Sequence, residues 1–272
     1  MGDATPASPE EPVLVRVERS VAVITLNRPR VLNAVNRPMA HGYAKALRAA
    51  DADPRVRGIV VTGAGRGFCS GADMAVFNGT PDEMRSFMVP REEMPHHALR
   101  LSKPVVAAVN GPVAGIGFAY MMGSDIRFAA KGATMSTVFP RLGLVAEYGL
   151  SWLLPRLIGG ARAMELLLSG RTIEAEEALR IGLVHRVSEP GEVLSDALDY
   201  TADLVANCAP SSLAVIKEQV YADLERPFEA ALDDAISRMN ASFGNPDLAE
   251  AIAARKEKRP PAFADPKPTS QA

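Results

Sequence analysis

Two glycine-rich segments of the chain each follow a short apolar run and lead into a predicted helix. The first, residues 63–74, follows the run 57–62, and the second, residues 110–117, follows Val105–Val109. The first N–H groups of a helix have no partner within it, so such turns aim free backbone donors at a ligand. Two donors that face one point form an oxyanion hole, which stabilises negative charge on a carbonyl oxygen.

The elements that position these turns can be predicted from local patterns. Both apolar runs are short and rich in β-branched residues, which is typical of buried strands. Residues 13–26 predict a hairpin, and Asn36 predicts the cap of a helix that extends to about Ala50. Strand, glycine turn and helix then alternate from residue 56 to 187, with further short strands at 126–128 and 183–187. The sequence therefore predicts a layered α/β core.

Strand patterns stop after Pro190, and the rest of the chain predicts helices. Residues 193–206, 211–224 and 228–243 have amphipathic spacing, and a last helix spans about 246–258. Polar, Pro-bearing ends are typical of disorder. The predicted organisation is a disordered tail at 1–12, a core at 13–192, a helical region at 193–263 and a disordered tail at 264–272.

Several short motifs occur in a consistent order along the chain. They lie at residues 26–34, 68–74, 103–117, 155–159, 178–184 and 257–263. In order and spacing they resemble the crotonase (enoyl-CoA hydratase/isomerase) superfamily over roughly residues 13–263. The resemblance implies an α/β fold, a crotonase-like spiral of ββα units with a C-terminal helical oligomerisation region that holds a homotrimer or a hexamer made of two trimers. It also implies an enzyme that acts on acyl-CoA.

The same resemblance implies roles for individual residues. The thioester oxygen would be held by the backbone N–H groups of Ala72 and Ile116. Coenzyme A, as part of the substrate, would contact a second set of residues, and no separate cofactor is implied. That set is Arg30, Val31, Leu32, Asp73, Met74 and Lys258. Ala75 stands where many members have a second lysine, so phosphate affinity would rest on Arg30, Arg91 or Lys258, although a solvated charge explains each equally.

The chain departs from the family pattern at both hydratase glutamates. Those positions hold Ala119 and Phe139, neither of which can exchange a proton. The usual hydration mechanism, which uses two glutamates as acid and base, therefore lacks both of these groups here. Glu147 lies eight residues beyond Phe139, where isomerase relatives have a catalytic aspartate and dehalogenase relatives a nucleophilic one. A carboxylate favoured by the dipole of a helix that starts near Gly149 explains Glu147 as well, and both readings can hold together.

Three functional hypotheses follow. In the first, an isomerase or atypical hydratase uses Glu147 as acid and base beside an enolate held by Ala72 and Ile116. In the second, a dehalogenase or hydrolase uses Glu147 as a nucleophile. In the third, the chain binds CoA thioesters without chemistry. Phe77, Phe118, Phe139 and Trp152 are candidates to line an apolar acyl pocket, although ordinary core positions are favoured for at least two of them.

Composition and the remaining motifs argue against several other classes of protein. The 32 acidic and 30 basic residues give no electrostatic case for nucleic acid. Phe68 replaces the third glycine of a dinucleotide fingerprint, and no His/Cys spacing suits a metal. Cys69 and Cys208 are isolated, no signal peptide precedes the first strand, and no apolar run could span a membrane. We therefore expect a cytoplasmic protein that binds neither membrane nor nucleic acid.

Overall fold

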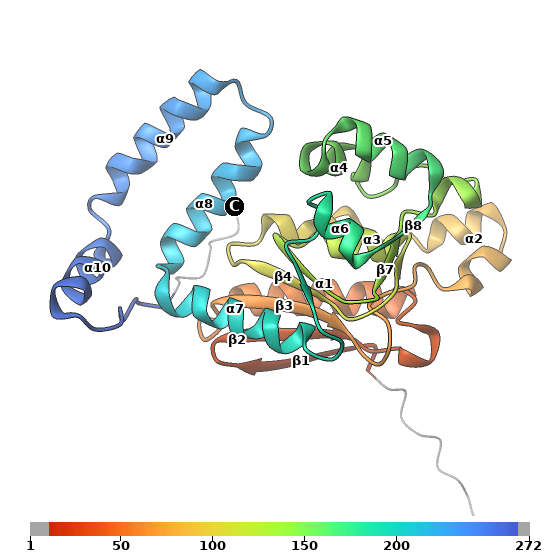
Figure 1. The fold of residues 1–272 in the computed structure, drawn as a ribbon, viewed down its shortest axis with the longest axis horizontal. Helices are drawn as coiled ribbons and strands as arrows, with labels where there is room; N and C mark the ends of the chain where they lie inside the picture. The colour runs from red at the N-terminus through yellow and green to blue at the C-terminus, as the bar shows by residue number, and fades with distance from the viewer. Residues whose placement is uncertain (1–10, 266–272) are drawn as a thin grey trace, which may run out of the picture.

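The computed structural model describes residues 11–265, which form two β-sheets with helices around them (Figure 1). Within this range the large sheet has the order β1-β2-β3-β4-β6-β9 and the small sheet the order β5-β7-β8. The pairs β1/β2 and β7/β8 are antiparallel, and all other neighbours run parallel. The predicted α/β class is confirmed. The strands are β1 (Val13–Glu18), β2 (Val21–Leu26), β3 (Gly58–Gly63), β4 (Val105–Val109), β5 (Val113–Ala114), β6 (Ile126–Ala130), β7 (Thr134–Ser136), β8 (Thr172–Glu174) and β9 (Arg186–Ser188).

The central strands of the large sheet are buried on both faces. Every residue of β3 and β4 is buried, which explains why the sequences of these strands are nearly continuous apolar runs. Helix α1 (Arg37–Ala52) covers one face and α7 (Val193–Asn207) covers the other, so the core has two apolar layers. Asn36 caps α1 as predicted, because its side chain accepts a hydrogen bond from the N–H of Met39 at 3.0 Å.

Short helices connect the strands of the two sheets. They are η1 (Pro29–Val31), η2 (Met74–Asn78), α2 (Pro81–Ser86), η3 (Arg91–Glu93), η4 (Pro95–Arg100), α3 (Ile116–Met122), η5 (Phe139–Leu142), α4 (Leu150–Ile158), α5 (Gly160–Ser169) and α6 (Ala175–Arg180). The helix predicted after the first glycine segment is a 3-10 helix, η2. The strand predicted at 183–187 begins only at Arg186, because residues 183 and 184 bond back to the end of α6.

The C-terminal helices stand away from the sheets (Figure 1). They are α8 (Pro210–Asp223), α9 (Phe228–Ser242) and α10 (Pro246–Glu257), which together with α7 confirm the helices predicted beyond Pro190. Large apolar side chains on them face solvent, among them Phe228, which is 75% exposed. Residues 1–10 and 266–272 lie outside the described residues, so disorder of the tails at 1–12 and 264–272 stays a prediction.

Helix α8 is anchored to the core through a buried cation. The ammonium of Lys217, whose side chain is only 8% exposed, contacts the Asp125 carboxylate at 2.8 Å. It also donates to the backbone carbonyls of Ala98 and Lys103, at 3.0 Å each. Asp125 in turn accepts hydrogen bonds from the Tyr221 hydroxyl and from the N–H of Val105 on β4. A complete set of partners makes this charge pair tolerable in the interior.

We predict that Lys217→Met destabilises the protein by about 3 to 5 kcal/mol, because it leaves the Asp125 carboxylate buried without its counter-charge. Thermal unfolding at one fixed protein concentration measures the effect. Lys45→Met, at an exposed position on α1, is the control and should change stability by no more than about 0.5 kcal/mol. Equal melting temperatures for the two variants would show that Lys217 does not anchor α8.

Candidate active site

The two glycine segments lie side by side and are joined by backbone hydrogen bonds. The N–H of Cys69 donates to the carbonyl of Pro112 at 3.2 Å, and the N–H of Ala114 donates to the carbonyl of Cys69 at 3.0 Å. These bonds form a parallel bridge between Cys69 and Val113. The first segment therefore runs along the residues that lead into α3.

Three glycines make this close approach possible. A Cβ atom at Gly117 would lie 2.2 Å from the carbonyl oxygen of Cys69, so no side chain fits there. Gly71 and Gly115 have φ values of 117° and 52°, which L side chains rarely adopt. A Cβ at Gly115 would lie 3.8 Å from the Cα of Gly71. The start of α3 thus rests directly against the first turn.

The N–H groups next to these glycines are the candidate donors. The flanking N–H groups are engaged, since Asp73 donates to the Val35 carbonyl and Gly115 donates to the Ser136 carbonyl. Among the described residues the N–H of Ala72 has no backbone acceptor, and Ile116, the first residue of α3, has none within its helix. The two candidate donors therefore each follow a glycine of the contact between Gly71 and Gly115, and neither has an acceptor of this kind.

The positions of the usual hydratase glutamates belong to the apolar core. Ala119 on α3 is 3% exposed and Phe139 at the start of η5 is 2% exposed. Phe118 is buried with them, which confirms core positions for two of the four aromatic residues considered for the acyl pocket. Phe77 and Trp152 are more accessible, and the Trp152 ring stacks under the Arg156 guanidinium at 4.1 Å.

Glu147 lies in the loop before α4 and is half-buried. In the described part of the chain its carboxylate has no hydrogen bond and no ion pair, and burial raises the pKa of this carboxyl. Tyr148 and Gly149 follow with φ values of 53° and 76°, so the chain turns sharply into α4. Glu147 precedes the N-terminus of α4 by three residues. This position suits a carboxylate that acts as acid and base, and it also suits one that is stabilised by the helix dipole.

Residues expected to contact coenzyme A gather beside the first glycine turn. Arg30 and Val31 belong to η1, and the carbonyl of Val31 accepts a hydrogen bond from Ser70. The Asp73 carboxylate pairs with Arg28 at 2.8 Å. Hydrogen bonds from the Ala75 N–H and from Arg28 hold the pKa of Asp73 below its usual value. Leu32 ends η1 in the left-handed conformation, and Met74 opens η2 with 68% of its surface exposed.

Asn33 is a positioning residue whose role the sequence did not reveal. It is fully buried, and its amide donates to the carbonyls of Ala64 and Gly67 while its carbonyl accepts from the N–H of Arg28. These bonds fix η1 against the first glycine segment. In the sequence, Asn33 is a polar residue between two apolar ones within the motif at residues 26–34, and this pattern alone did not indicate its role.

Comparison with known proteins identifies the family. A family model described as "Enoyl-CoA hydratase/isomerase" matches residues 16–266. The chain belongs to this family. It is 34% identical to an Escherichia coli protein named "1,2-epoxyphenylacetyl-CoA isomerase", over 92% of this chain and 97% of that protein. It is 36% identical to a "Probable enoyl-CoA hydratase" of Rhodobacter capsulatus, over 91% and 95%.

Solved structures of the enoyl-CoA hydratase/isomerase family share the fold. A probable enoyl-CoA hydratase/isomerase from Mycobacterium abscessus superposes with a TM-score of 0.85 at 32% identity, over 93% of this chain and 99% of that one. The predicted crotonase fold and membership of an enzyme family are therefore confirmed. Within residues 11–265 no helix is long and apolar enough to cross a membrane, and no cluster of side chains suits a metal ion.

Lys258 is a predicted site residue that this chain does not bring to the first glycine turn. It ends α10, which lies on the opposite side of the molecule from α2 and hence from the neighbouring η2 (Figure 1). The segment after it returns to the core at Arg57, whose guanidinium binds the Phe263 carbonyl and the Asp265 carboxylate. Arg57 precedes β3, whereas the first glycine turn follows β3, about 20 Å further along the strand.

We predict that Gly117→Ala lowers stability by about 1 to 3 kcal/mol, because the added methyl group overpacks the contact with Cys69. Gly160→Ala is the matched control, since a Cβ there meets nothing within 4 Å. A glycine replaced by alanine at a free helical position should be neutral or stabilise slightly. Thermal unfolding compares the variants, and a Gly117→Ala protein as stable as the control would contradict the close approach.

Proposed function

We propose that this protein is an acyl-CoA isomerase, or a related enolate-forming enzyme, in which the Ala72 and Ile116 N–H groups hold the thioester oxygen and Glu147 moves the proton. The observation that supports the proposal is the contact between the two glycine turns, because Ala72 and Ile116 directly follow the glycines that meet there and their N–H groups have no backbone acceptor among the described residues. Donors fixed before the reaction stabilise an enolate oxygen without reorganising.

The proposed reaction needs a single carboxylate. Ionised Glu147 removes a proton from one carbon of the acyl chain, and the electron pair moves to the thioester oxygen as an enolate. Protonated Glu147 then returns the proton to another carbon of the conjugated system, so the double bond moves and the carboxylate is regenerated. A carboxyl whose pKa is raised by burial suits both halves of this cycle.

Residues 119 and 139 argue against standard hydration. Hydration requires a carboxylate that binds and activates water, yet both positions are apolar and buried. The E. coli relative named an isomerase gives additional support for isomerisation of a CoA thioester. Attack by Glu147 on the substrate as a nucleophile, as in a hydrolase, and thioester binding without chemistry are the two other outcomes that the test below separates.

We predict that Glu147→Gln keeps thioester binding but slows exchange of the C2 proton of a saturated acyl-CoA with deuterated water by a factor of about 10² to 10⁴. Mass spectrometry of the acyl-CoA measures exchange, and calorimetry measures binding. In the wild type, exchange should fall on acidification at a pH above the titration range of an exposed glutamate, because the Glu147 pKa is raised and protonation removes the base.

Glu176→Gln on α6 is the control for this experiment, because Glu176 is exposed and distant in sequence from the proposed site. It should exchange the C2 proton as the wild type does. Exchange that is equally fast in Glu147→Gln would exclude Glu147 as the base. Binding without exchange in the wild type would favour binding without catalysis. An acyl anhydride on Glu147, formed with release of CoA, would favour Glu147 as a nucleophile.

We further propose that copies of this chain associate through the C-terminal helices as a trimer or hexamer. The exposed apolar residues of α8 to α10 are more than a monomer usually leaves in water. They include Ile216, Val220, Phe228, Ile236, Met239 and Phe243. Association would also allow Lys258 of a second copy to reach the coenzyme A phosphates, which Lys258 of the same chain does not approach.

Light scattering should therefore give three or six times the chain mass of 29.0 kDa. Phe228→Asp should shift the population towards smaller species, because it places a charge in the buried interface. Asp233→Asn, which alters a charge on the same helix, provides the control for a general effect on α9. A wild-type protein that remains monomeric at micromolar concentration would contradict the proposal.

A further inference from the structure

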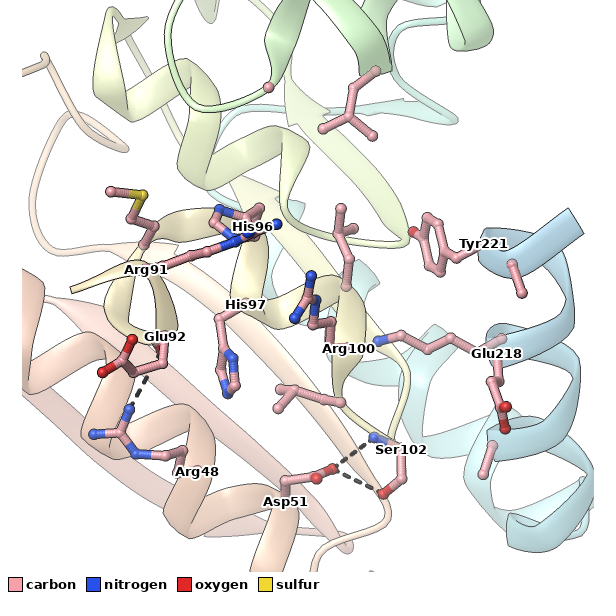
Figure 2. Close-up of a pocket in the computed structure, with 18 of the residues that line it drawn as sticks. Arg48, Asp51, Arg91, Glu92, His96, His97, Arg100, Ser102, Glu218 and Tyr221 are labelled. Carbon is pink, nitrogen blue, oxygen red and sulfur yellow. Dashed lines mark hydrogen bonds between the residues drawn. The ribbon is translucent and has the colours of Figure 1, made fainter. Parts of the chain in front are cut away.

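A cleft of about 1600 Å³ lies between the core and α8 (Figure 2). Its walls come from the end of α1, from η3 and η4, from the start of α4 and from α8. The described residues that line it do not include Ala72, Ile116 or Arg30. The cleft is therefore separate from the side on which coenzyme A is expected.

The cleft adjoins the proposed acid/base residue. Tyr148 and Gly149, the two residues that follow Glu147, form part of its wall. The Tyr148 side chain also lies near enough to Tyr120 on α3 to influence its ionisation. Tyr120 is four residues beyond Ile116, which is about 6 Å along the helix. Tyr148 thus connects α3, which begins at Ile116, to the wall of the cleft.

Two arginines of the cleft have no partner of their own. The guanidinium groups of Arg91 and Arg100 make no hydrogen bond and no ion pair with any described residue, and both side chains are exposed. Figure 2 shows them on the same segment as His96, which lies beside Arg91. Burial and then the charges of Arg100, Arg91 and His97 lower the pKa of His96, and no carboxylate acts on it. The charged groups that act on His96 are therefore cationic, whereas Asp51 and Glu92 act on the neighbouring His97.

Most carboxylates that line the cleft already have hydrogen-bond or ion-pair partners. Asp51 accepts hydrogen bonds from Ser102, as Figure 2 shows, and from the N–H of Lys103. Glu93 contacts His41 at 3.0 Å, and Glu218 pairs with Arg238 at 2.9 Å. Two further carboxylates, at positions 92 and 225, lack such partners, but neither acts on His96. An anion supplied from outside would be the counter-charge for the two arginines.

We propose that this cleft receives the far end of the acyl chain and that the substrates are acyl-CoAs whose chain ends in a carboxylate, held by Arg91 and Arg100. Guanidinium groups bind carboxylates through paired, charge-assisted hydrogen bonds. Apolar side chains line the same cleft and suit the methylene chain between the two ends. They include Met94, Leu99, Leu101, Trp152 and Leu153. The inference rests on the proposed function, because it places the thioester at Ala72 and Ile116.

The test compares saturated acyl-CoAs of equal length that end in a carboxylate or in a methyl group, such as adipoyl-CoA and hexanoyl-CoA, and then suberoyl-CoA and octanoyl-CoA. Deuterium exchange at C2 gives kcat/KM for each. For at least one of the two chain lengths, we expect the wild type to have a kcat/KM about tenfold or more higher with the carboxylate-ended member of the pair. This is the usual effect of a hydrogen bond between charged groups. The double variant R91Q/R100Q should lose that preference, so that the two chain ends give equal kcat/KM.

Arg162→Gln is the matched control, because Arg162 is exposed on α5 and does not line the cleft. It should keep both rates. Equal kcat/KM for the two chain ends at every length in the wild type, or a preference that survives in R91Q/R100Q, would overturn the inference and leave the proposed function standing. A wild type that exchanges neither substrate would instead remove the proposed function, and this inference with it.

Discussion

The contact between the start of α3 and the first glycine turn is the constraint on which the site depends. At Gly117 the backbone of α3 meets the Cys69 carbonyl so closely that a single methyl group does not fit. The hydrogen bonds between residues 69 and 114 then fix the register of the two turns. Because α3 begins immediately beyond the buried strands β4 and β5, the sheets determine where its first turn lies. The close approach of the two turns thus follows from strand packing and from the lack of a side chain at Gly117.

The apolar surroundings of this contact bear on the chemistry that it can support. Ala119 and Phe139 replace the two hydratase carboxylates with apolar groups, and both lie in the buried core that also contains Ile116. Burial likewise favours the neutral form of Glu147, and in the proposed mechanism low polarity would strengthen each hydrogen bond to the enolate. Loss of the hydratase glutamates and retention of one half-buried carboxylate are therefore consistent with each other. Together they favour proton transfer between carbons over addition of water.

Local chemistry explains what could be predicted from the sequence. The β-branched runs of β3 and β4, the Asn36 cap and the glycine turns each act within a few residues, and the structure confirms all of them. The missed features depend on distant segments. Asn33 acquires its role only when residues 64 and 67 fold against it, and the cleft exists only because α8 lies across from η4. The distance of Lys258 from η1 likewise depends on the direction in which α8 to α10 leave the core.

That direction is set by a few polar contacts, whereas the apolar faces of the helices remain uncovered. Lys217 fixes α8 through Asp125 and two backbone carbonyls, so the helix cannot fold back over the sheet without leaving a buried charge unpaired. The chain thus holds its own apolar helices away from its core and leaves the cleft open between them. Phe228 and Phe243 are exposed on these helices, and exposed apolar patches are typical of interaction sites. The anchor that holds α8 across from the cleft therefore also leaves uncovered the apolar surface that we propose for a second copy.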